Sequence, residues 1–338
     1  MRYEDLFTDK SIVVTGGTGS FGKAFANRLL KEYEFKELII YSRDEYKQFV
    51  MKNELAAVYS PEKMKKLKFF IGDVRDRERL SRVFEGVDYV IHAAAMKQVP
   101  TCEYNPMEAI KTNINGAQNV IDAALDRQVN KVVALSTDKA VNPINLYGGT
   151  KLVSDKLFVA ANGYSKGENP TIFSVVRYGN VAGSRGSVIP FFEKLLAEKA
   201  TELPITDMRM TRFWITLDEG IDLVLKAIEE AKGGETYISK IPSFDIVDLA
   251  KAMGGEEITL KEVGIREGEK LHEVMVTKDD AANTYEYDKH YIIYPHFEWW
   301  DKKTSFLKGG VKVEEGFEYH SGTNTQWLSI DDLRKEIE

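Results

Sequence analysis

Short apolar runs alternate with stretches of helical periodicity through the first half of the chain. Residues 11–17, SIVVTGG, form the first apolar run, and 22–33, GKAFANRLLKEY, follow with apolar positions at helical spacing. The expected strands are 11–17, 37–43, 67–74, 87–95, 131–137 and 171–181, and the expected helices are 22–33, 45–59, 75–86, 106–127 and one that begins at Tyr147. This alternation predicts an α/β fold of the Rossmann type, a doubly wound parallel sheet with helices on both faces.

The pattern loosens after Val181. Residues 183–200 begin as a Gly/Ser loop and become a helix, and 212–231 read as another helix. Residues 243–255 and 329–338 open with the Ser and Asp residues that are typical of helix N-caps. We therefore expect a nucleotide-binding Rossmann domain over 1–182. A smaller substrate-binding C-terminal domain is expected over 183–338, with some segments returning to the sheet.

Composition narrows the class of protein. Of 338 residues 43% are hydrophobic and 29% are charged, which is typical of a folded globular chain, and the net charge of −7 argues against nucleic acid as a partner. The single cysteine, Cys102, excludes a disulfide within the chain, and the five histidines show no metal-ligand spacing. No apolar run approaches the roughly 18 residues of a membrane span, and the charged N-terminus lacks a signal-peptide centre. We expect a cytoplasmic protein without a metal or a membrane partner.

A glycine-rich loop follows the first expected strand. Gly16, Gly19 and Gly22 recur at three-residue spacing between that strand and a helix, which is the context that a dinucleotide-binding loop requires. Glycine allows the backbone N–H groups to approach a pyrophosphate, and the positive end of the helix dipole faces that anion. The alternative is a purely structural turn. The loop residues expected to touch the dinucleotide are Gly16, Thr18, Gly19, Ser20, Phe21 and Gly22.

The end of the second strand bears on the choice of cofactor. An acidic residue there binds the ribose 2′-hydroxyl of NAD, whereas an arginine pairs with the 2′-phosphate of NADP. Here Ser42 and Arg43 come before Asp44, which favours NADP; Lys47 either assists or belongs to a solvated helix face. The cofactor contacts expected here are Ser42, Arg43, Asp44 and Lys47. Further contacts are expected at the ends of the third and fourth strands, at Asp73, Val74, Ala93 and Ala94.

Candidate catalytic residues lie just after the fifth strand. Tyr147 and Lys151 are four residues apart and share one helix face. A nearby ammonium lowers the pKa of a tyrosine from about 10. Such a tyrosine can take a proton from an alcohol while hydride leaves for a nicotinamide. The Y-x-x-x-K pattern is common by chance, and the glycine loop upstream gives it meaning.

These motifs resemble a known superfamily. T-G-x-x-G-x-x-G at 15–22 together with Y-x-x-x-K is similar to the extended short-chain dehydrogenase/reductases. Residues 136–151, 177–192, 208–216 and 266–273 resemble a narrower family, the inverting UDP-N-acetylglucosamine 4,6-dehydratases, which open the pseudaminic-acid route and related nucleotide-sugar routes. The similarity runs from Lys10 to about Leu333. Thr137-Asp138-Lys139 stands where dehydratases of the wider superfamily carry Ser/Thr-Asp-Glu, a replacement that the inverting family shares.

The resemblance implies roles for this cluster. Tyr147 would take the proton of the sugar C4 hydroxyl, which Thr137 hydrogen-bonds, and Lys151 would also hold the nicotinamide ribose. Lys139 would remove the C5 proton, which requires a pKa depressed by burial or by a neighbouring cation such as Lys151. Asp138, protonated, would assist loss of the C6 hydroxyl. The alternative for Asp138 and Lys139 is a surface ion pair.

The family also implies a substrate site and an assembly. The substrate would be UDP-N-acetylglucosamine, and the product UDP-2-acetamido-2,6-dideoxy-beta-L-arabino-hex-4-ulose. Asn113 would support the catalytic helix, and the family forms ring-like homo-hexamers. The expected substrate contacts are Lys97, Asn180 near the pyrophosphate, Arg185, Arg209, Arg266, and Glu269 at the uridine ribose.

Two alternatives stay open at this point. One is another enzyme on the same scaffold, a UDP-sugar 4-epimerase or a C5-retaining dehydratase. Lys139 in place of glutamate argues against the usual retaining dehydratase. The other is a non-catalytic dinucleotide-sensing protein, against which the full set of Tyr147, Lys151, Asp138 and Lys139 argues.

Overall fold

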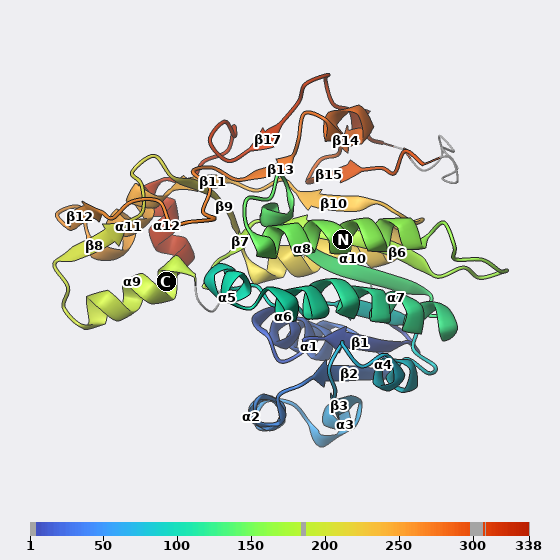
Figure 1. Ribbon diagram of the computed structural model, residues 1–338. Helices are drawn as coiled ribbons and strands as arrows, with labels where there is room; N and C mark the ends of the chain where they lie inside the picture. Colours follow the sequence, from blue (N-terminus) through green and yellow to red (C-terminus); the bar gives the residue numbers. More distant parts are fainter. Residues whose placement is uncertain (1–4, 184–186, 298–306, 308, 338) are drawn as a thin grey trace.

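A mixed sheet forms the centre of the molecule. The computed structural model describes residues 5–183, 187–297, 307 and 309–337. In spatial order, the parallel part of the sheet comprises β3 (Leu67–Ile71), β2 (Glu37–Ser42), β1 (Ser11–Thr15), β4 (Tyr89–His92), β5 (Lys131–Thr137), β6 (Ile172–Tyr178) and β10 (Thr236–Ser239). The expected parallel α/β sheet is confirmed for these strands (Figure 1).

Three antiparallel strands extend the sheet beyond β10. They are β15 (His290–Ile293), β14 (Thr284–Glu286) and β16 (Val311–Lys312). The pattern before residue 181 carried no sign of them, because they come from the C-terminal part of the chain. Strand β10 and helix α10 (Leu217–Glu230) also belong to this sheet or its covering layers. A division at 182 therefore stays a prediction.

Helices cover both faces of the sheet, so that its central strands are buried on both sides. In β1, Ile12 and Val14 face the core shared with α1 (Ser20–Glu32) and α10, while Val13 faces the opposite core. That opposite core is completed by α4 (Arg77–Val83), α7 (Gly116–Asp126) and α8 (Leu146–Ala161). The remaining helices on this half are α2 (Glu45–Ala56), α3 (Pro61–Lys65), α5 (Val99–Tyr104) and α6 (Pro106–Ile110).

The expected helix over 106–127 is interrupted. A π-helical turn, η1 (Lys111–Asn115), separates α6 from α7. Within it, the Asn113 side chain accepts a hydrogen bond from Met96 N (2.8 Å) and donates to Met96 O and to Thr150 Oγ1 (both 2.9 Å). The turn thus directs the Asn113 side chain toward the loop after β4 and toward α8. Regular helical spacing in the sequence does not reveal this role.

Two other expected elements are wrong in part. The strand over 171–181 breaks at Gly179, where a Cβ would lie 2.7 Å from Phe213 Cβ, and β7 (Asn180–Val181) joins a second sheet. The first residues of the helix expected over 212–231 form β9 (Thr211–Ile215) instead. Helix α10 starts only after Thr216, whose side chain forms a capping box with Glu219.

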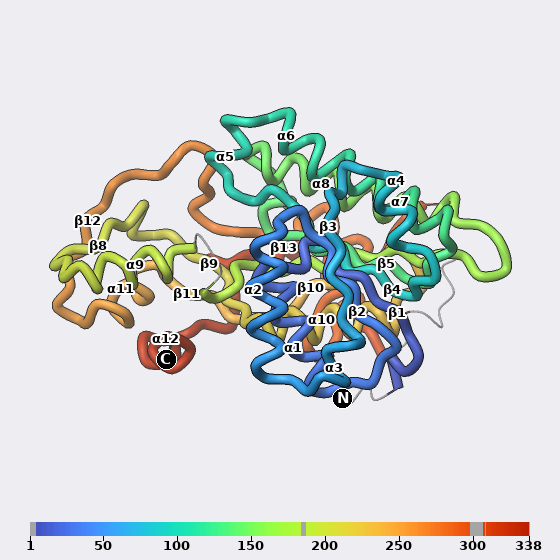
Figure 2. The backbone as a smooth tube through the Cα atoms, turned by 90° about the horizontal axis from the view of Figure 1, so that it is seen from below, coloured from blue at the N-terminus to red at the C-terminus, as the bar shows by residue number. Residues whose placement is uncertain are grey.

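A smaller region lies beside the carboxyl ends of the parallel strands, at the left of Figures 1 and 2. It contains α9 (Val188–Ala197), β8 (Glu202–Ile205), β11 (Ser243–Asp245), α11 (Ile246–Gly254), β12 (Thr259–Glu262) and α12 (Ile330–Ile337). Its own core includes Phe192, Leu203, Trp214, Phe244, Leu249 and Leu333. Between it and the sheet, β13 (Val274–Val276) pairs with β17 (Tyr319–His320); the 3-10 turns are η2 (Asp138–Ala140) and η3 (Asp280–Asn283). Among the described residues, no helix combines the length and apolar character of a membrane span.

Candidate active site

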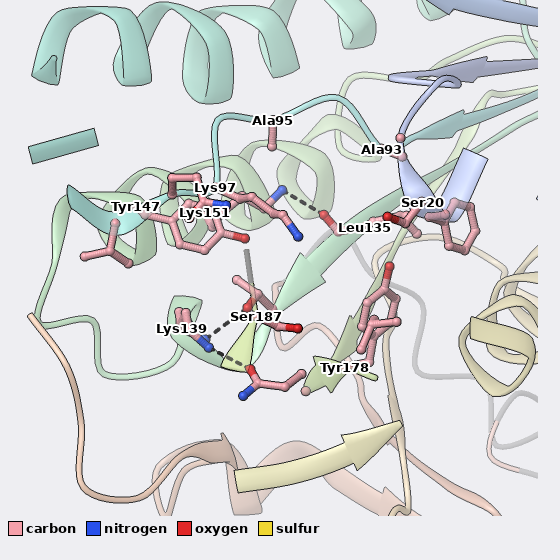
Figure 3. A pocket seen from close by; sticks show the side chains of 18 of the residues that line it. Ser20, Ala93, Ala95, Lys97, Leu135, Lys139, Tyr147, Lys151, Tyr178 and Ser187 are labelled. Carbon is pink, nitrogen blue, oxygen red and sulfur yellow. Dashed lines mark hydrogen bonds between the residues drawn. The ribbon is translucent and has the colours of Figure 1, made fainter. Parts of the chain in front are cut away.

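A cavity of about 1090 Å³ opens at the carboxyl ends of the parallel strands. Its walls include Gly16 after β1, Ser42 in β2, Ala93 after β4 and Thr137 in β5, and the smaller region closes the other side (Figure 3). Ligands of open α/β sheets bind at this edge.

The glycine loop forms one end of this cavity. Gly16 has φ +66°, and a Cβ there would lie 2.8 Å from the backbone nitrogen of Ala94. Gly19 is the N-cap of α1 and supplies no side-chain cap, so the positive end of the helix is left for another anion. Every loop residue named from the sequence, Gly16, Thr18, Gly19, Ser20, Phe21 and Gly22, lines the cavity. The cradle fits a dinucleotide pyrophosphate.

The end of β2 presents positive charge. The Asp44 carboxylate caps α2 by accepting from Lys47 N (2.9 Å), and it also pairs with Lys47 Nζ (2.9 Å). The exposed Arg43 guanidinium lies 3.6 Å from Asp73 Oδ2. Arg43 and Asp44 both line the cavity, as expected, but the Asp44 carboxylate is engaged locally by Lys47. The other expected cofactor contacts, Ser42, Lys47, Asp73, Val74, Ala93 and Ala94, line it as well.

Tyr147 and Lys151 project from the first turns of α8. Asn145 starts this helix as its N-cap, accepting from Gly148 N (2.7 Å). Both side chains are buried at the cavity wall, and Lys151 Nζ donates to Leu135 O (2.7 Å). Figure 3 places the two side chains together with Lys97.

The expected effect of Lys151 on Tyr147 is wrong for the free protein. Burial raises the pKa of Tyr147 to about 12, and the charge of Lys139, rather than that of Lys151, is the main influence that lowers it. Burial lowers the pKa of Lys151 itself, and Asp155 opposes this. A phenolate at Tyr147 therefore needs more positive charge than the free site supplies.

Thr137, Asp138 and Lys139 lie where β5 ends and η2 begins. Lys139 Nζ donates to Asp138 Oδ1 (3.0 Å) and to Asn180 Oδ1 (3.1 Å). Thr137 Oγ1 also donates to Asp138 Oδ1 (2.9 Å). Lys139 borders the cavity, whereas Asp138 is fully buried behind it, so the pair is not a surface ion pair.

The resting charge of Lys139 differs from the expectation. Burial alone would lower its pKa, but the carboxylates of Asp138 and Glu273 together raise it above the usual value. Glu273 Oε1 lies 3.4 Å from Lys139 Nζ. The prediction of a neutral Lys139 amine is wrong for the free protein. It did not include the second carboxylate, Glu273, because that residue is distant in sequence.

The expected substrate contacts divide into three groups. Lys97, Asn180, Arg266 and Glu269 line the cavity. Arg209 is not among the lining residues and forms a forked pair with Asp207, Nη2 to Oδ2 at 2.7 Å. Arg185 lies outside the described residues.

Sequence reasoning missed two site residues, Glu273 and Asn145. Glu273 lines the cavity, and its Oε1 lies 3.8 Å from Nε of Arg212, which also lines it. Nothing in the local pattern distinguishes Glu273 from a surface charge, because only the tertiary fold brings it to β5. Asn145 was identifiable, since an Asn directly before a helical pattern is an N-cap signal.

Comparisons with known proteins agree with this geometry. The family model described as polysaccharide biosynthesis protein matches residues 12–295. The UDP-N-acetylglucosamine 4,6-dehydratase (inverting) of Campylobacter jejuni subsp. jejuni is 55% identical over 98% of both chains. A UDP-glucose 4-epimerase of Rickettsia akari is 43% identical over 98% of this chain and 96% of its own.

A solved structure extends the likeness to three dimensions. Pen from Bacillus thuringiensis has a TM-score of 0.86 and 39% identity, with 98% of each chain covered. The family match, the 55% identity and the shared fold confirm the resemblance stated from the motifs. The chain therefore belongs to the polysaccharide biosynthesis protein family and is a homologue of the inverting UDP-N-acetylglucosamine 4,6-dehydratases.

Proposed function

We propose that this protein is a UDP-N-acetylglucosamine 4,6-dehydratase that inverts C5. The observation that carries the proposal is the Asp138–Lys139 pair, joined at 3.0 Å beside the same cavity that Tyr147 and the glycine loop line. Dehydration needs a base at C5 and an acid at the C6 hydroxyl in addition to the group that acts at C4. A 4-epimerase has no use for that extra pair, and the function named for the 55% identical relative supports the same choice.

The cofactor in this proposal is NADP. When bound, a nicotinamide dinucleotide supplies reversible hydride chemistry, taking hydride from C4 and returning it at C6. The N-terminus of α1 and the loop around Gly16 would hold the pyrophosphate. Arg43 and Lys47 offer positive charge to a 2′-phosphate, and the engaged carboxylate of Asp44 offers little to a free 2′-hydroxyl.

Tyr147 begins the reaction in this scheme by taking the proton of the C4 hydroxyl. Its pKa of about 12 in the free protein must fall when the site is filled, and the charges of Lys139 and of a bound nicotinamide both act in that direction. Thr137 lies beside Tyr147 at the end of β5 and would hydrogen-bond the C4 oxygen. Lys151, fixed by Leu135 O, would hold the nicotinamide ribose.

The Asp138–Lys139 pair then carries out the elimination. Transfer of one proton from Lys139 Nζ to Asp138 Oδ1, across the 3.0 Å hydrogen bond, turns the ion pair into a neutral amine and a carboxylic acid. The amine takes the C5 proton, and the acid gives its proton to the C6 hydroxyl, which leaves as water. The pair is thereby returned to its ionic form. A proton from solvent water then adds to C5 from the opposite face and inverts that centre.

The nucleotide end of the substrate would meet positive charge from two sides. Lys97, in the loop after β4, and Arg266, between β12 and β13, suit the diphosphate. Asn180 lies in β7, and Glu269 would accept from the uridine ribose. Arg209 is omitted from this assignment because Asp207 holds its guanidinium.

The decisive experiment incubates the purified protein with UDP-N-acetylglucosamine in deuterated water and follows the product by NMR and mass spectrometry. We expect loss of one water, deuterium at C5 and inverted C5 configuration. Lys139→Met should lose C5 exchange and still reduce the cofactor, whereas Tyr147→Phe should lose both. Lys261→Met, at a lysine whose side chain is 63% exposed, is the control for loss of a charge.

Each alternative gives a different result in the same experiment. A product with the mass of the substrate identifies an epimerase, and retained C5 configuration identifies a retaining dehydratase. Cofactor binding without any product would support a sensing protein. Each of these results contradicts the proposal.

Cofactor choice is tested by calorimetry of NADP and NAD binding. Arg43→Ala should weaken NADP binding by roughly 10- to 100-fold, because a charge-assisted bond to phosphate contributes about 1.5–3 kcal/mol, and leave NAD binding unchanged. Lys52→Ala, an exposed position of α2 that does not line the cavity, controls for net charge. An equal effect on both dinucleotides would assign Arg43 to something other than the 2′-phosphate.

The assembly belongs to the proposal as well. The resemblance implies a homo-oligomer, a hexamer, and a cytoplasmic location. Light scattering on the purified protein tests the hexamer, and a monomer at working concentration would contradict it.

A further inference from the structure

Glu273 is a buried carboxylate that the proposed steps leave without a task. Its residue is 2% exposed, it borders the cavity, and its Oε1 lies 3.4 Å from Lys139 Nζ. Within the described part of the chain, its Oε2 has no hydrogen-bond donor, although Lys270 Nζ is 3.8 Å away. A buried carboxylate without full hydrogen bonding is costly, so its retention beside the candidate base calls for a physical reason.

Ser321 holds the backbone of Glu273 at both its N–H and its carbonyl. Its N–H donates to Ser321 Oγ (2.9 Å), and its carbonyl accepts from Ser321 N (2.8 Å). Ser321 Oγ is in turn 2.7 Å from Thr211 Oγ1, so β9, β13 and the segment after β17 are tied together at this point. The Glu273 carboxylate therefore approaches Lys139 from a backbone that these hydrogen bonds hold in place.

Several charged groups face Lys139. Asp138 lies on its own element, Glu273 comes from the start of β13, and Arg212 comes from β9. Lys270 and Lys97 contribute weaker repulsion, and Tyr147 faces the ammonium from α8. The carboxylates of Asp138 and Glu273 both stabilise the Lys139 ammonium, whereas the surrounding cations favour loss of its proton. The balance among these charges depends on whether Glu273 is ionised.

We propose that Glu273 is a positioning residue for the Asp138–Lys139 pair: its carboxylate holds Lys139 Nζ against Asp138 and determines how tightly the pair retains its shared proton. The inference rests on the proposed function, in which that proton alternates between the two side chains. Glu273 acts through Lys139 and takes no part in bond breaking.

The test measures the C5 exchange rate against pH in wild type and in Glu273→Gln, which keeps the shape and removes the charge. In the active form the pair holds one proton, and a second proton abolishes activity. Removing an opposite charge within about 4 Å should move the acid-side midpoint of the profile down by about one to three pH units. Glu273→Asp, which draws the charge back by one methylene, should give an intermediate midpoint.

Glu235→Gln is the matched control. Glu235 is also 2% exposed, but its carboxylate accepts from Lys232 N and Gly233 N at the far end of the sheet. Its loss removes a buried carboxylate without touching the cavity, so the midpoint should stay at the wild-type value. A shift equal to that of Glu273→Gln would show that the effect is general destabilisation and would overturn the inference.

A second measurement does not depend on turnover. Trace acetylation with acetic anhydride at pH 9, read by peptide mass spectrometry, reports the neutral fraction of each lysine, with exposed Lys261 as internal standard. Glu273→Gln should raise acetylation of Lys139 by about tenfold or more, since one pH unit of pKa changes the neutral fraction tenfold. Unchanged acetylation and an unchanged midpoint in folded protein overturn the inference.

The two proposals fail in different ways. If wild type dehydrates no UDP-N-acetylglucosamine, the proposed function fails while acetylation still tests Glu273. If Glu273→Gln does not fold, Glu273→Asp takes its place, and Lys139 acetylation equal to wild type in that variant contradicts the role of Glu273.

Discussion

Three lysines that line one cavity have different acid–base properties because their partners differ. Burial lowers the pKa of Lys97 and of Lys151, whereas two carboxylates raise that of Lys139 despite burial. Residue type alone therefore does not predict the charge at this site. The sequence identified Lys139 as the candidate base, but its ionisation depends on Glu273, which only the fold brings near.

His92 makes a prediction about stability and pH. It is buried in β4 with Nδ1 2.8 Å from Thr15 Oγ1, and burial together with the charge of Lys151 lowers its pKa to about 3. Below pH 6.5, His92 binds a proton in the unfolded chain but not in the folded chain. The contribution of neutral His92 to the free energy of unfolding is therefore complete above pH 6.5 and is lost as the pH falls toward 3, by up to about 1.4 kcal/mol per pH unit.

Urea unfolding of wild type and His92→Gln at pH 6.5 and pH 5 measures this contribution. Wild type should lose up to about 2 kcal/mol more than the variant over that interval, since Gln does not titrate. Equal losses in the two proteins would show that His92 is not a source of acid sensitivity.

At the scale of elements, strongly periodic segments were predictable and interruptions were not. The sequence predicted β1, α1 and α8 because apolar spacing marks them. It did not reveal the π-helical turn at 111–115, the break at Gly179 or the strand β9. Each of these depends on a neighbour in space: Met96 and Thr150, Phe213, and β7 and β11, respectively.

The loop between β1 and α1 gives a prediction on cofactor binding. Gly16→Ala places a methyl 2.8 Å from the backbone of Ala94 at φ +66°, so the loop must shift away from its phosphate-binding shape. We expect loss of measurable dinucleotide binding by calorimetry. Gly86→Ala is the matched control, because Gly86 has a similar φ of +70° with nothing within 4 Å of an added Cβ.

The control separates strain from collision. Gly86→Ala should cost about 1–2 kcal/mol of stability and leave dinucleotide binding intact. Retained binding in Gly16→Ala would show that the loop is not the pyrophosphate site.

The π-helical turn makes a prediction about stability. Asn113→Ala removes three hydrogen bonds and leaves the amide groups of Met96 short of partners, at a cost of about 2–4 kcal/mol in the free energy of unfolding. The comparison is Asn119→Ala, on the following helix α7. It removes the hydrogen bond that the Asn119 side chain donates to Val74 O and should cost about 1 kcal/mol. Equal costs in urea unfolding would mean that Asn113 does not hold the turn.

At the scale of the whole molecule, the C-terminal part of the chain returns to complete both sheet and site. Strand β15 pairs with β10, and β14 pairs with β15. Arg177 in β6 donates to Met275 O (2.8 Å), and β17 pairs with β13 next to Glu273. The sequence predicted the nucleotide half of the site well, because its motifs are local. The opposite wall could not be predicted from spacing, because it is assembled from distant segments that include the start of α9, β9 and the residues before β13.

Tyr319 tests this long-range connection. Its hydroxyl accepts from Ile241 N and donates to Ile241 O, both at 2.8 Å. Tyr319→Phe leaves the buried Ile241 N–H unpaired, while Ile241 O keeps its bond from Asn324 Nδ2 (2.9 Å), so the cost should be about 1–3 kcal/mol. Because β17 also holds β13, turnover should fall while dinucleotide binding, measured by calorimetry, stays near wild type. Tyr291→Phe is the control, since its hydroxyl has no hydrogen bond among the described residues and its ring packs on Tyr319. A matching fall in dinucleotide binding would contradict the separation of the two halves.

The bracketing of Lys139 between Asp138 and Glu273 has a consequence for biosynthesis. The ribosome makes the glycine loop, Tyr147 and Asp138 before it makes Glu273 and its anchor Ser321. A nascent chain would thus acquire its capacity to hold a nucleotide before its capacity to eliminate water. We expect ribosome-bound intermediates that stop before Ser321 to bind the cofactor and to carry out no elimination.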